Sequence, residues 1–160
     1  MKILILGDVM GISGREAIKK NLPKIINDNK IDFTIINGEN AADNGRGITQ
    51  LIAEEFFLQG VDVITSGNHI WDKQETADYI NKESRLLRPA NLAQGSPGNG
   101  YGIYLTKNKK FKVGVINLMG NVFMRKTEDV FELARKIRDK IVLKKNVDFI
   151  VVDFHGEFTS

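Results

Sequence analysis

The sequence predicts an α/β fold, because short runs of β-branched and aromatic residues alternate with longer segments in which apolar residues recur every three or four positions. The short runs end abruptly at glycine or polar residues, which is typical of strands buried in a helix-covered sheet. With 160 residues and 42% hydrophobic content the chain can close one core, so we expect a single domain over residues 1–160. The expected strands are residues 3–6, 33–36, 61–65, 113–116 and 149–152.

Two helices are expected between the first three strands. In residues 15–29 the apolar side chains follow helical spacing, and Pro23 allows a kink or a late start. Residues 49–59 show the same spacing and end at Gly60, a residue typical of helix C-termini. A short third helix is expected around residues 71–80.

The second half of the chain predicts a loop, a hairpin and one more helix. Residues 85–101 are rich in glycine and contain two prolines, which indicates a long loop. Residues 101–106 and 111–116 read as the two strands of a β-hairpin. Residues 127–145 are amphipathic and predict a helix.

Composition excludes several classes of site. The sequence has no cysteine, so disulfides, thiolate nucleophiles, iron–sulfur clusters and cysteine-based zinc sites are excluded. No apolar run approaches the ~20 residues of a membrane span. The run at 3–6 is also too short for a signal peptide, so we expect a cytoplasmic protein with no membrane partner. A formal net charge of +3 argues against a dedicated polyanion-binding protein.

Side chains that can bind metals follow four of the expected strands. Because ligands of open α/β sheets lie beyond the carboxyl ends of the strands, these side chains should converge on one site. They are Asp8 after the first strand, Glu39 and Asn40 after the second, Asn68 and His69 after the third, and His155 after the last.

This mixture of ligands suits divalent cations, which accept carboxylate oxygen, amide oxygen and imidazole nitrogen. Two ions ~3.5–4 Å apart can clamp a phosphoryl group and lower the pKa of a bridging water. Glu39 is the natural candidate for the carboxylate that bridges them. A histidine that binds no metal can protonate the leaving oxygen, because imidazole titrates near neutral pH. Ligands without sulfur favour manganese or iron, and zinc or magnesium is compatible.

Each of these residues also has a purely structural interpretation. Asp8 could cap the helix that follows it, and the polar pair after the second strand could simply form a turn. Asn68 and His69 could cap the short third helix, and His155 could be a hydrogen-bonded structural histidine. The arrival of four strand ends at one edge favours the metal site over these separate explanations.

Six segments resemble the YmdB-like branch of the calcineurin-like metallophosphoesterases, and together they cover essentially the whole chain. The segments around Glu39 and Pro89 are specific to this branch, whereas the one around Asn68 occurs across many phosphoesterases. The segments are Gly7-Asp8-Val9, Asn37-Gly38-Glu39-Asn40-Ala41-Ala42, Gly67-Asn68-His69-Ile70-Trp71-Asp72, Leu87-Arg88-Pro89-Ala90-Asn91, Asn117-Leu118-Met119-Gly120 and Asp153-Phe154-His155.

The resemblance implies a four-layer α/β/β/α sandwich with a di-metal centre. It also implies phosphodiesterase activity toward small phosphodiesters, notably 2′,3′-cyclic nucleotides, by a metal-bridging hydroxide. His69 takes the proton-donor position of the family. The metal ligands implied are Asp8 on the first metal, Glu39 bridging both, Asn40 in or against the coordination shell, and Asn68 and His155 on the second metal.

The family pattern also includes a Gly-x-His-x-His segment whose histidines complete the metal shells. This sequence has two histidines in total, His69 and His155. We therefore expect each metal to lack one protein ligand and the sandwich to lack its C-terminal portion. An open sheet edge would follow, which we expect a homo-oligomer to cover. The alternative function is a non-catalytic, truncated metal- or nucleotide-binding remnant that self-assembles.

Three further features have weaker functional interpretations. The turn at residues 11–15 lacks both the G-x-G-x-x-G and the Walker pattern, so it predicts a helix start rather than a nucleotide loop, although Arg15 could reach a substrate phosphate. The basic residues of 135–145 could touch RNA, but a solvated helix face with 3/4-spaced ion pairs is favoured. Trp71 could stack on a base or pack in the core.

Overall fold

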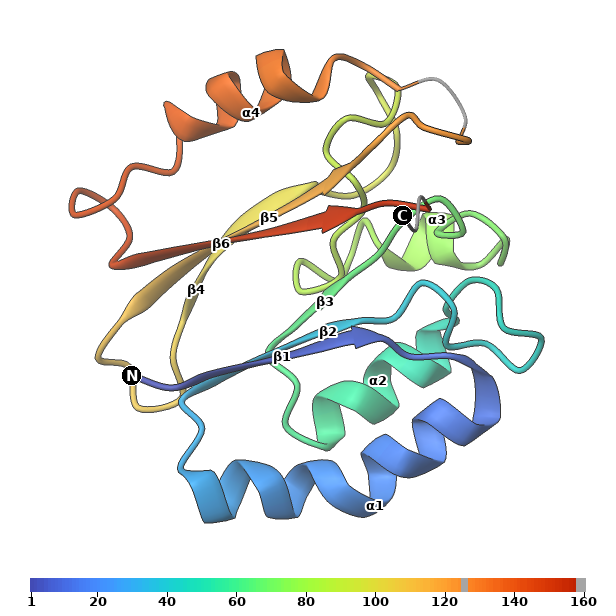
Figure 1. The fold of residues 1–160 in the computed structure, drawn as a ribbon, viewed down its shortest axis with the longest axis vertical. Coiled ribbons are helices and arrows are strands. Elements are labelled where there is room, and N and C mark those ends of the chain that lie inside the picture. The colour runs from blue at the N-terminus through green and yellow to red at the C-terminus, as the bar shows by residue number, and fades with distance from the viewer. Residues whose placement is uncertain (125–126, 158–160) are drawn as a thin grey trace.

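The computed structural model describes residues 1–124 and 127–157. It contains two three-stranded sheets that lie face to face, with helices on the outer side of each (Figure 1). The elements are β1 (Ile3–Asp8), α1 (Gly11–Asn29), β2 (Phe33–Asn37), α2 (Gln50–Leu58), β3 (Val63–Thr65), α3 (Thr76–Tyr79), β4 (Tyr101–Leu105), β5 (Lys112–Met119), α4 (Val130–Arg138) and β6 (Phe149–His155).

The first sheet is parallel, in the order β1-β2-β3, so the carboxyl ends of all three strands lie at one edge. Its outer face is covered by α1 and α2. Leu22 of α1 and Phe56 of α2 belong to one buried cluster with Ile36 and Ile64 of the sheet. This burial of apolar side chains on both faces explains why β2 has no exposed residue.

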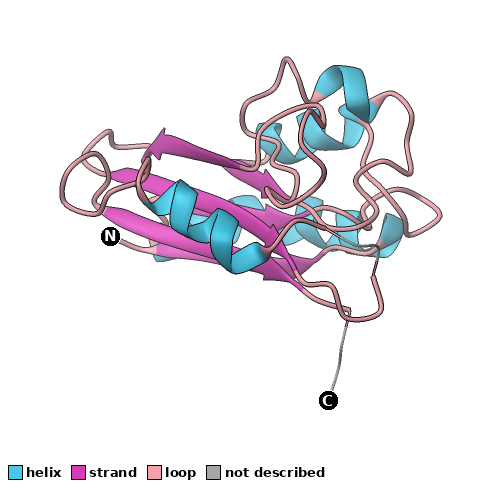
Figure 2. Ribbon diagram, turned by 90° about the horizontal axis from the view of Figure 1, so that it is seen from above, coloured by secondary structure: helices cyan, strands magenta, loops and turns pink. Residues whose placement is uncertain are grey.

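The second sheet is mixed, since β4 pairs antiparallel with β5 and β5 pairs parallel with β6. On its outer face Ile137 of α4 packs with Ile116 and Leu118 of β5. A separate cluster fills the space between the sheets, where Phe33 and Val115 are both buried. The predicted α/β fold and its four-layer α/β/β/α arrangement are therefore confirmed, and Figure 2 shows the layers from above.

Several predicted elements have different bounds in the structure, and four of them show how. The helix expected at 127–145 is α4, which begins after the Asp129 cap and ends at Arg138, because the Asn146 side chain then bonds the backbone of Val142 and Lys140. The helix expected at 15–29 already begins at Gly11 and runs through Pro23 without a break. The helix expected at 71–80 is reduced to α3, and the strand expected at 61–65 is reduced to β3.

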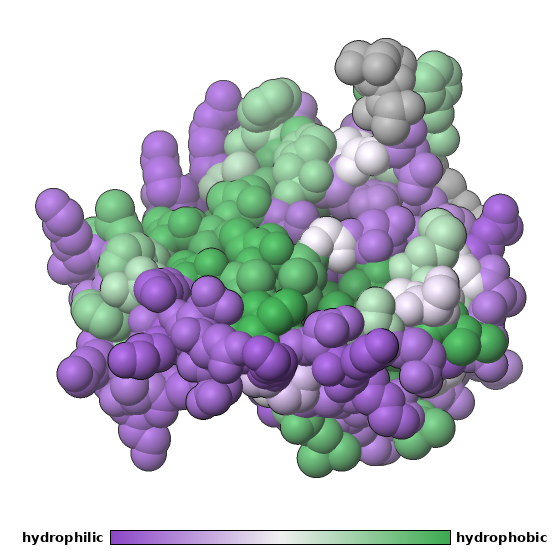
Figure 3. All heavy atoms as spheres, turned by 60° about the horizontal axis from the view of Figure 1, so that its bottom comes forward, coloured by the Kyte–Doolittle hydropathy of each residue, from purple (hydrophilic) through white to green (hydrophobic). Residues whose placement is uncertain are grey.

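The interpretation of residues 149–152 as a strand buried on both faces is wrong. β6 is an edge strand, and Phe149, Ile150 and Val152 are all exposed. β1 is also an edge, with Ile5 56% exposed, and Figure 3 shows apolar side chains gathered on one face of the molecule. An unpaired strand edge with apolar neighbours is the open edge that we expected from the sequence. No helix of the described residues is long and apolar enough to cross a membrane.

Candidate metal centre

The strand ends bring the six predicted site residues together at one edge of the sandwich. Five of the six line a cavity of about 420 Å³, and the sixth, Asn68, is hydrogen-bonded to one of these five. The parallel register explains the first half of this convergence, because Asp8 pairs with Asn37 and Asn37 pairs with Thr65. The residues that line the cavity are Asp8, Met10, Glu39, Asn40, Gly45, Arg46, His69, His155, Gly156 and Glu157.

Glu39 occupies the middle of the cluster. Its Oε1 lies 3.2 Å from the Asn40 Nδ2 and 3.2 Å from the His155 Nε2. The same Asn40 nitrogen donates to both carboxylate oxygens of Asp8, at 3.1 and 2.9 Å. Glu39 therefore connects the Asp8 side of the cluster, from the first sheet, with the His155 side, from the second.

The Glu39 carboxyl is fully buried, and burial raises its pKa from 4.5 to about 7. The negative charges of Asp8 and Glu157 add to this rise, whereas the backbone N–H of His69 and the Asn40 amide lower the pKa. Within the described residues the second oxygen, Oε2, is buried and has no hydrogen-bond partner. A buried, unpartnered carboxylate oxygen is costly unless a cation or proton satisfies it.

His155 is held between three side chains. Its Nε2 lies 2.7 Å from Asn68 Oδ1 and 3.3 Å from Glu157 Oε1, in addition to its contact with Glu39. The ligand atoms of Glu39, His155 and Glu157 all lie within 4.8 Å of one another. Sequence reasoning missed Glu157, which lies two residues after His155 on the same strand end and is signalled by the His-x-Glu spacing alone.

Gly67 allows this close packing of residues from two sheets. A Cβ atom at Gly67 would overlap Glu39 Oε2 and would lie 2.5 Å from the ring of His155. Any larger residue would thus occupy the space into which the unpartnered carboxylate oxygen projects. The Gly67-Asn68-His69 segment therefore requires glycine for steric reasons rather than for backbone conformation.

His69 is paired with an aspartate on the following turn. Its Nδ1 lies 2.9 Å from Asp72 Oδ2, and the Asp72 N–H donates to the His69 carbonyl at 3.0 Å. With Nδ1 at Asp72, Nε2 is the ring nitrogen left for the cavity. Asp72 was not singled out from the sequence as a site residue, because the i,i+3 contact depends on a turn that the expected helix at 71–80 would not have contained.

Two buried asparagines fix the strand ends across the sheets. Asn37 receives the Glu39 N–H on its Oδ1 and donates to Asp153 of β6. Asn117 exchanges two hydrogen bonds with the Ser66 backbone, at 2.9 and 3.0 Å. Both residues are short polar interruptions at the end of an apolar run, and this is the signal by which the sequence could have identified them.

Asp8, Asn68 and His69 do not cap the helices that follow them. The helix α1 has no side-chain cap, and Asp8 instead contacts Asn40. The helix α3 likewise has no side-chain cap, so Asn68 and His69 do not cap it. Glu39 and Asn40 do lie in a turn, but their side chains meet other strand ends there.

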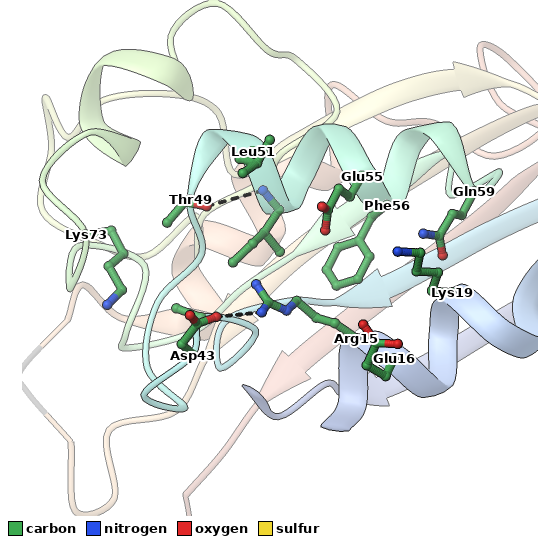
Figure 4. Close-up of a pocket in the computed structure, with 12 residues that line it drawn as sticks. Arg15, Glu16, Lys19, Asp43, Thr49, Leu51, Glu55, Phe56, Gln59 and Lys73 are labelled. Carbon is green, nitrogen blue, oxygen red and sulfur yellow. Dashed lines mark hydrogen bonds and ion pairs between the residues drawn. The ribbon is translucent and has the colours of Figure 1, made fainter. Parts of the chain in front are cut away.

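Arg15 does not line the candidate metal centre. Its guanidinium pairs with Asp43 at 2.5 Å, in a separate cavity of about 430 Å³ between α1 and α2 (Figure 4). Trp71 packs partly buried against the core of the first sheet, so core packing is the better interpretation. The basic residues of α4 include the ion pair that was expected for a solvated helix face, since Lys136 and Glu132 lie 2.7 Å apart at helical spacing.

The donor set fits divalent cations. Carboxylates of Asp8 and Glu39, the amide oxygen of Asn68 and the imidazole of His155 are the ligand types that such ions accept. The unpartnered Glu39 Oε2 and the space kept open at Gly67 lie within the same cluster. Asn40 presents its nitrogen to the two carboxylates, so metal ligation through its oxygen would require the amide to turn over.

Comparisons with known proteins agree with this architecture. A 2′,3′-cyclic-nucleotide 2′-phosphodiesterase of Bacillus subtilis is 43% identical over 162 residues, which cover 100% of this chain and 59% of that protein. The crystal structure of a novel phosphatase from Mycoplasma pneumoniae has a TM-score of 0.85 and 34% identity, over 99% of this chain and 56% of that one. A 5′-nucleotidase from Candida albicans shares the fold alone, with a TM-score of 0.52 and 17% identity over 96% of this chain and 36% of that one.

The fold is therefore that of the α/β sandwiches of the phosphoesterase type. The family model described as YmdB-like protein matches residues 4–160, and the chain belongs to this family. The chain spans less than two thirds of the length of the relatives it matches.

Proposed function

We propose that this chain carries the metal-binding and proton-donating residues of a metal-dependent phosphodiesterase that acts on cyclic nucleotides or related small phosphodiesters. The observation that carries the proposal is the convergence of four strand ends on Glu39, whose buried Oε2 has no partner among the described residues. The names of the relatives support a phosphoester substrate.

In this proposal Asp8, Glu39, Asn68 and His155 would hold two divalent cations, and the central Glu39 would contribute to both. Manganese or iron is favoured by the oxygen and nitrogen ligands, and zinc or magnesium is compatible. When bound, the cations supply Lewis-acid stabilisation of the phosphate charge and lower the pKa of a water nucleophile.

The protein side chains orient the substrate and move the proton. Asn40 holds the Asp8 and Glu39 carboxylates in place through its amide nitrogen. His69 donates a proton from Nε2 to the leaving oxygen, and Asp72 keeps the ring in the required orientation. The low exposure of Glu39 keeps bulk water from competing for its carboxylate.

The test is turnover of 2′,3′-cyclic AMP and of bis(p-nitrophenyl) phosphate by the 160-residue chain with added Mn²⁺. We expect turnover that EDTA abolishes and that is lost in Asp8→Ala and in His69→Ala. Asp28→Ala is the control, because Asp28 lies on α1 and pairs only with the neighbouring Lys24 among the described residues. Turnover that persists in Asp8→Ala would refute the proposal.

A second candidate is favoured by one observation: the sequence contains only His69 and His155 as histidines. A chain with this few imidazoles can hold cations without completing an active centre, as a metal- or nucleotide-binding remnant. Folded protein that binds Mn²⁺ by calorimetry but hydrolyses neither substrate would support this candidate. Mn²⁺-dependent turnover would exclude it.

The open β6 edge supports the self-association that we expected from the sequence. Val152 and Phe154 are 50% and 55% exposed on this edge strand. We expect light scattering to report an oligomer that Phe154→Lys converts to a monomer, because a charge on an edge strand opposes pairing. A monomeric parent chain would contradict this part of the proposal.

A further inference from the structure

The loop between β2 and α2 presents one arginine, Arg46, to the cavity of the candidate metal centre. Apart from the histidines, Arg46 is the one cationic side chain among the described residues that line this cavity, beside the carboxylates of Asp8, Glu39 and Glu157. These carboxylates repel anionic substrates, whereas the positive charge of Arg46 at the same cavity attracts the anionic group of a substrate.

The loop is built rigidly around Arg46. The two neighbouring residues, Gly45 and Gly47, both have positive φ angles, of 73° and 82°, which side chains rarely tolerate. The Gly45 N–H donates to the Ala42 carbonyl at 2.7 Å, and the Gly47 N–H donates to the Glu39 carbonyl at 2.5 Å. Both neighbours of Arg46 are therefore anchored by backbone hydrogen bonds, and Gly47 is bonded directly to Glu39, the central residue of the candidate metal centre.

The other basic residues near this loop are used for structural contacts. Arg15 pairs with Asp43 on the outer side of the loop, and Lys73 donates to Asn44 at 3.0 Å. Arg46 is exposed, and within residues 1–124 and 127–157 it forms neither an ion pair nor a hydrogen bond. The Arg46 guanidinium is thus available for a ligand, whereas the Arg15 guanidinium and the Lys73 ammonium already have protein partners.

Met10 forms the adjacent part of the wall. It lies between β1 and α1, is 57% exposed and also lines the cavity. Its Cγ lies 3.7 Å from the position that a Cβ of Gly45 would take, so Met10 and the Arg46 loop are direct neighbours. The Gly11 N–H fixes this corner by donating to the Asn40 carbonyl at 2.8 Å. An exposed thioether beside a guanidinium is suited to a planar, aromatic group attached to an anion.

From this arrangement we propose that Arg46 binds the phosphate group of the substrate and that Met10 packs against the planar group attached to it. This inference rests on the proposed phosphodiesterase site. Arg46 and Met10 together are called its binding wall. The substrate class is a phosphoester that carries a nucleobase or another aromatic group. Arginine suits this role because its planar fork can donate two parallel hydrogen bonds to phosphate oxygens.

The test compares binding of two probes to the Mn²⁺-loaded 160-residue chain by calorimetry: inorganic phosphate and adenosine 3′-monophosphate. We expect Arg46→Ala to weaken both about tenfold, the size of one charge-assisted hydrogen bond. Arg46→Lys should recover part of this loss. Met10→Ala should weaken adenosine 3′-monophosphate about threefold to fivefold and leave inorganic phosphate unchanged. The affinity for Mn²⁺ should be unaltered in all variants.

Arg135→Ala is the matched control, since it removes the same charge from the exposed face of α4. Equal phosphate affinity in Arg46→Ala and Arg135→Ala, or no phosphate binding by the parent chain, overturns the inference. A loss of Mn²⁺ affinity in Arg46→Ala also overturns it, because Arg46 would then only support the metal centre. A Met10→Ala variant that weakens both probes equally removes Met10 from the proposal.

Turnover of 2′,3′-cyclic AMP, measured in parallel, separates this inference from the proposed function. If no variant turns over substrate but phosphate binding depends on Arg46, the proposed function fails and the binding wall stands. If turnover is present and Arg46→Ala leaves KM unchanged, the wall fails and the proposed function stands. We expect a raised KM with kcat changed by less than about threefold, the pattern of lost uniform binding.

Discussion

The two sheets contribute unequally to the candidate metal centre and are buried to different depths. Every residue of β2 is buried, whereas none of the seven residues of β6 is. The first sheet delivers Asp8, Glu39 and Asn68 from three adjacent parallel strands. The second sheet delivers His155 from its exposed edge strand. One half of the site thus stands on a fully packed sheet, and the other half depends on contacts that cross between the sheets.

An apolar cluster joins the two sheets farther from the site, but the side-chain contacts that cross between them at the site are polar. Asn37 bonds Asp153, Asn117 bonds the Ser66 backbone, and Asn68 bonds His155. A buried hydrogen bond contributes about 1 kcal/mol net, but an abandoned partner costs more. The loss of one such hydrogen bond should therefore displace His155 more easily than Glu39, which follows the fully buried strand β2.

The largest expected effect is a difference in the free energy of unfolding between a substitution in β2 and one in β6. Phe33→Ala removes a fully buried ring from β2 and should lower the free energy of unfolding by about 3–5 kcal/mol. Phe154→Ala removes a ring that is 55% exposed on β6 and should cost less than about 1 kcal/mol. Urea unfolding followed by circular dichroism measures both. Similar losses in the two variants would mean that β6 is as well packed as β2.

The second prediction concerns the pH dependence of the buried half. Because burial raises the pKa of Glu39 to about 7, the metal-free folded state favours the protonated carboxyl. The stability from this group is fully present below pH 4.5 and is lost as the pH rises through about 7. The loss should be about 3 kcal/mol, because each pKa unit of the rise from 4.5 to about 7 is worth about 1.4 kcal/mol.

Unfolding of the metal-free chain at pH 4.5, 6 and 8 tests this, with Glu39→Gln as the comparison variant. Glutamine cannot ionise, so the difference between the two chains should grow in favour of the variant as the pH rises. Saturating Mn²⁺ should remove most of the pH dependence, since a cation satisfies the carboxylate. A parent chain that shows the same pH profile as Glu39→Gln would contradict the pKa shift.

The third prediction concerns the junction between the two sheets. Gly67→Ala places a methyl group against Glu39 Oε2 and the His155 ring, so it should lower the affinity for Mn²⁺ by about 10- to 100-fold. Gly7→Ala is the matched control, because a Cβ at Gly7 would meet no atom within 4 Å even though Gly7 precedes Asp8. Calorimetric titration with Mn²⁺ gives both values. Equal affinity in the two variants would show that the Gly67 space is not needed.

The same difference between the sheets explains how far the sequence could be interpreted. The β2 run and the polar residues after it follow from local pattern, because a strand buried on both faces is apolar throughout. The exposure of β6 did not follow, since its sequence is just as apolar and only its edge position leaves it uncovered. The apolar pattern of a segment shows that it can be buried, and the position of the strand in the sheet decides whether it is buried.

The site shows a similar limit. The strand-end residues were predicted because the parallel topology by itself brings them to one edge. Glu157, Asp72 and Arg46 were not, because each depends on a turn or loop geometry that spacing alone does not fix. The end of α4 was placed seven residues too far along for the same reason, since Asn146 replaces helical hydrogen bonds with its own side chain.

The smallest predicted effect lies within the first sheet and tests whether its half of the site is positioned independently of the second. Asp72→Asn keeps the shape of the side chain but removes the charge that holds His69 Nδ1 at 2.9 Å. We expect turnover of 2′,3′-cyclic AMP to fall about tenfold, because the ring loses its fixed orientation, while the affinity for Mn²⁺ stays unchanged. Asp78→Asn, on the exposed side of α3, is the control. Neither His69 nor Asp72 bonds a residue of β6 among the described residues, so Asp72→Asn should leave intact the Mn²⁺ affinity to which His155 contributes. A lower Mn²⁺ affinity in Asp72→Asn would mean that the two halves of the site act as one unit.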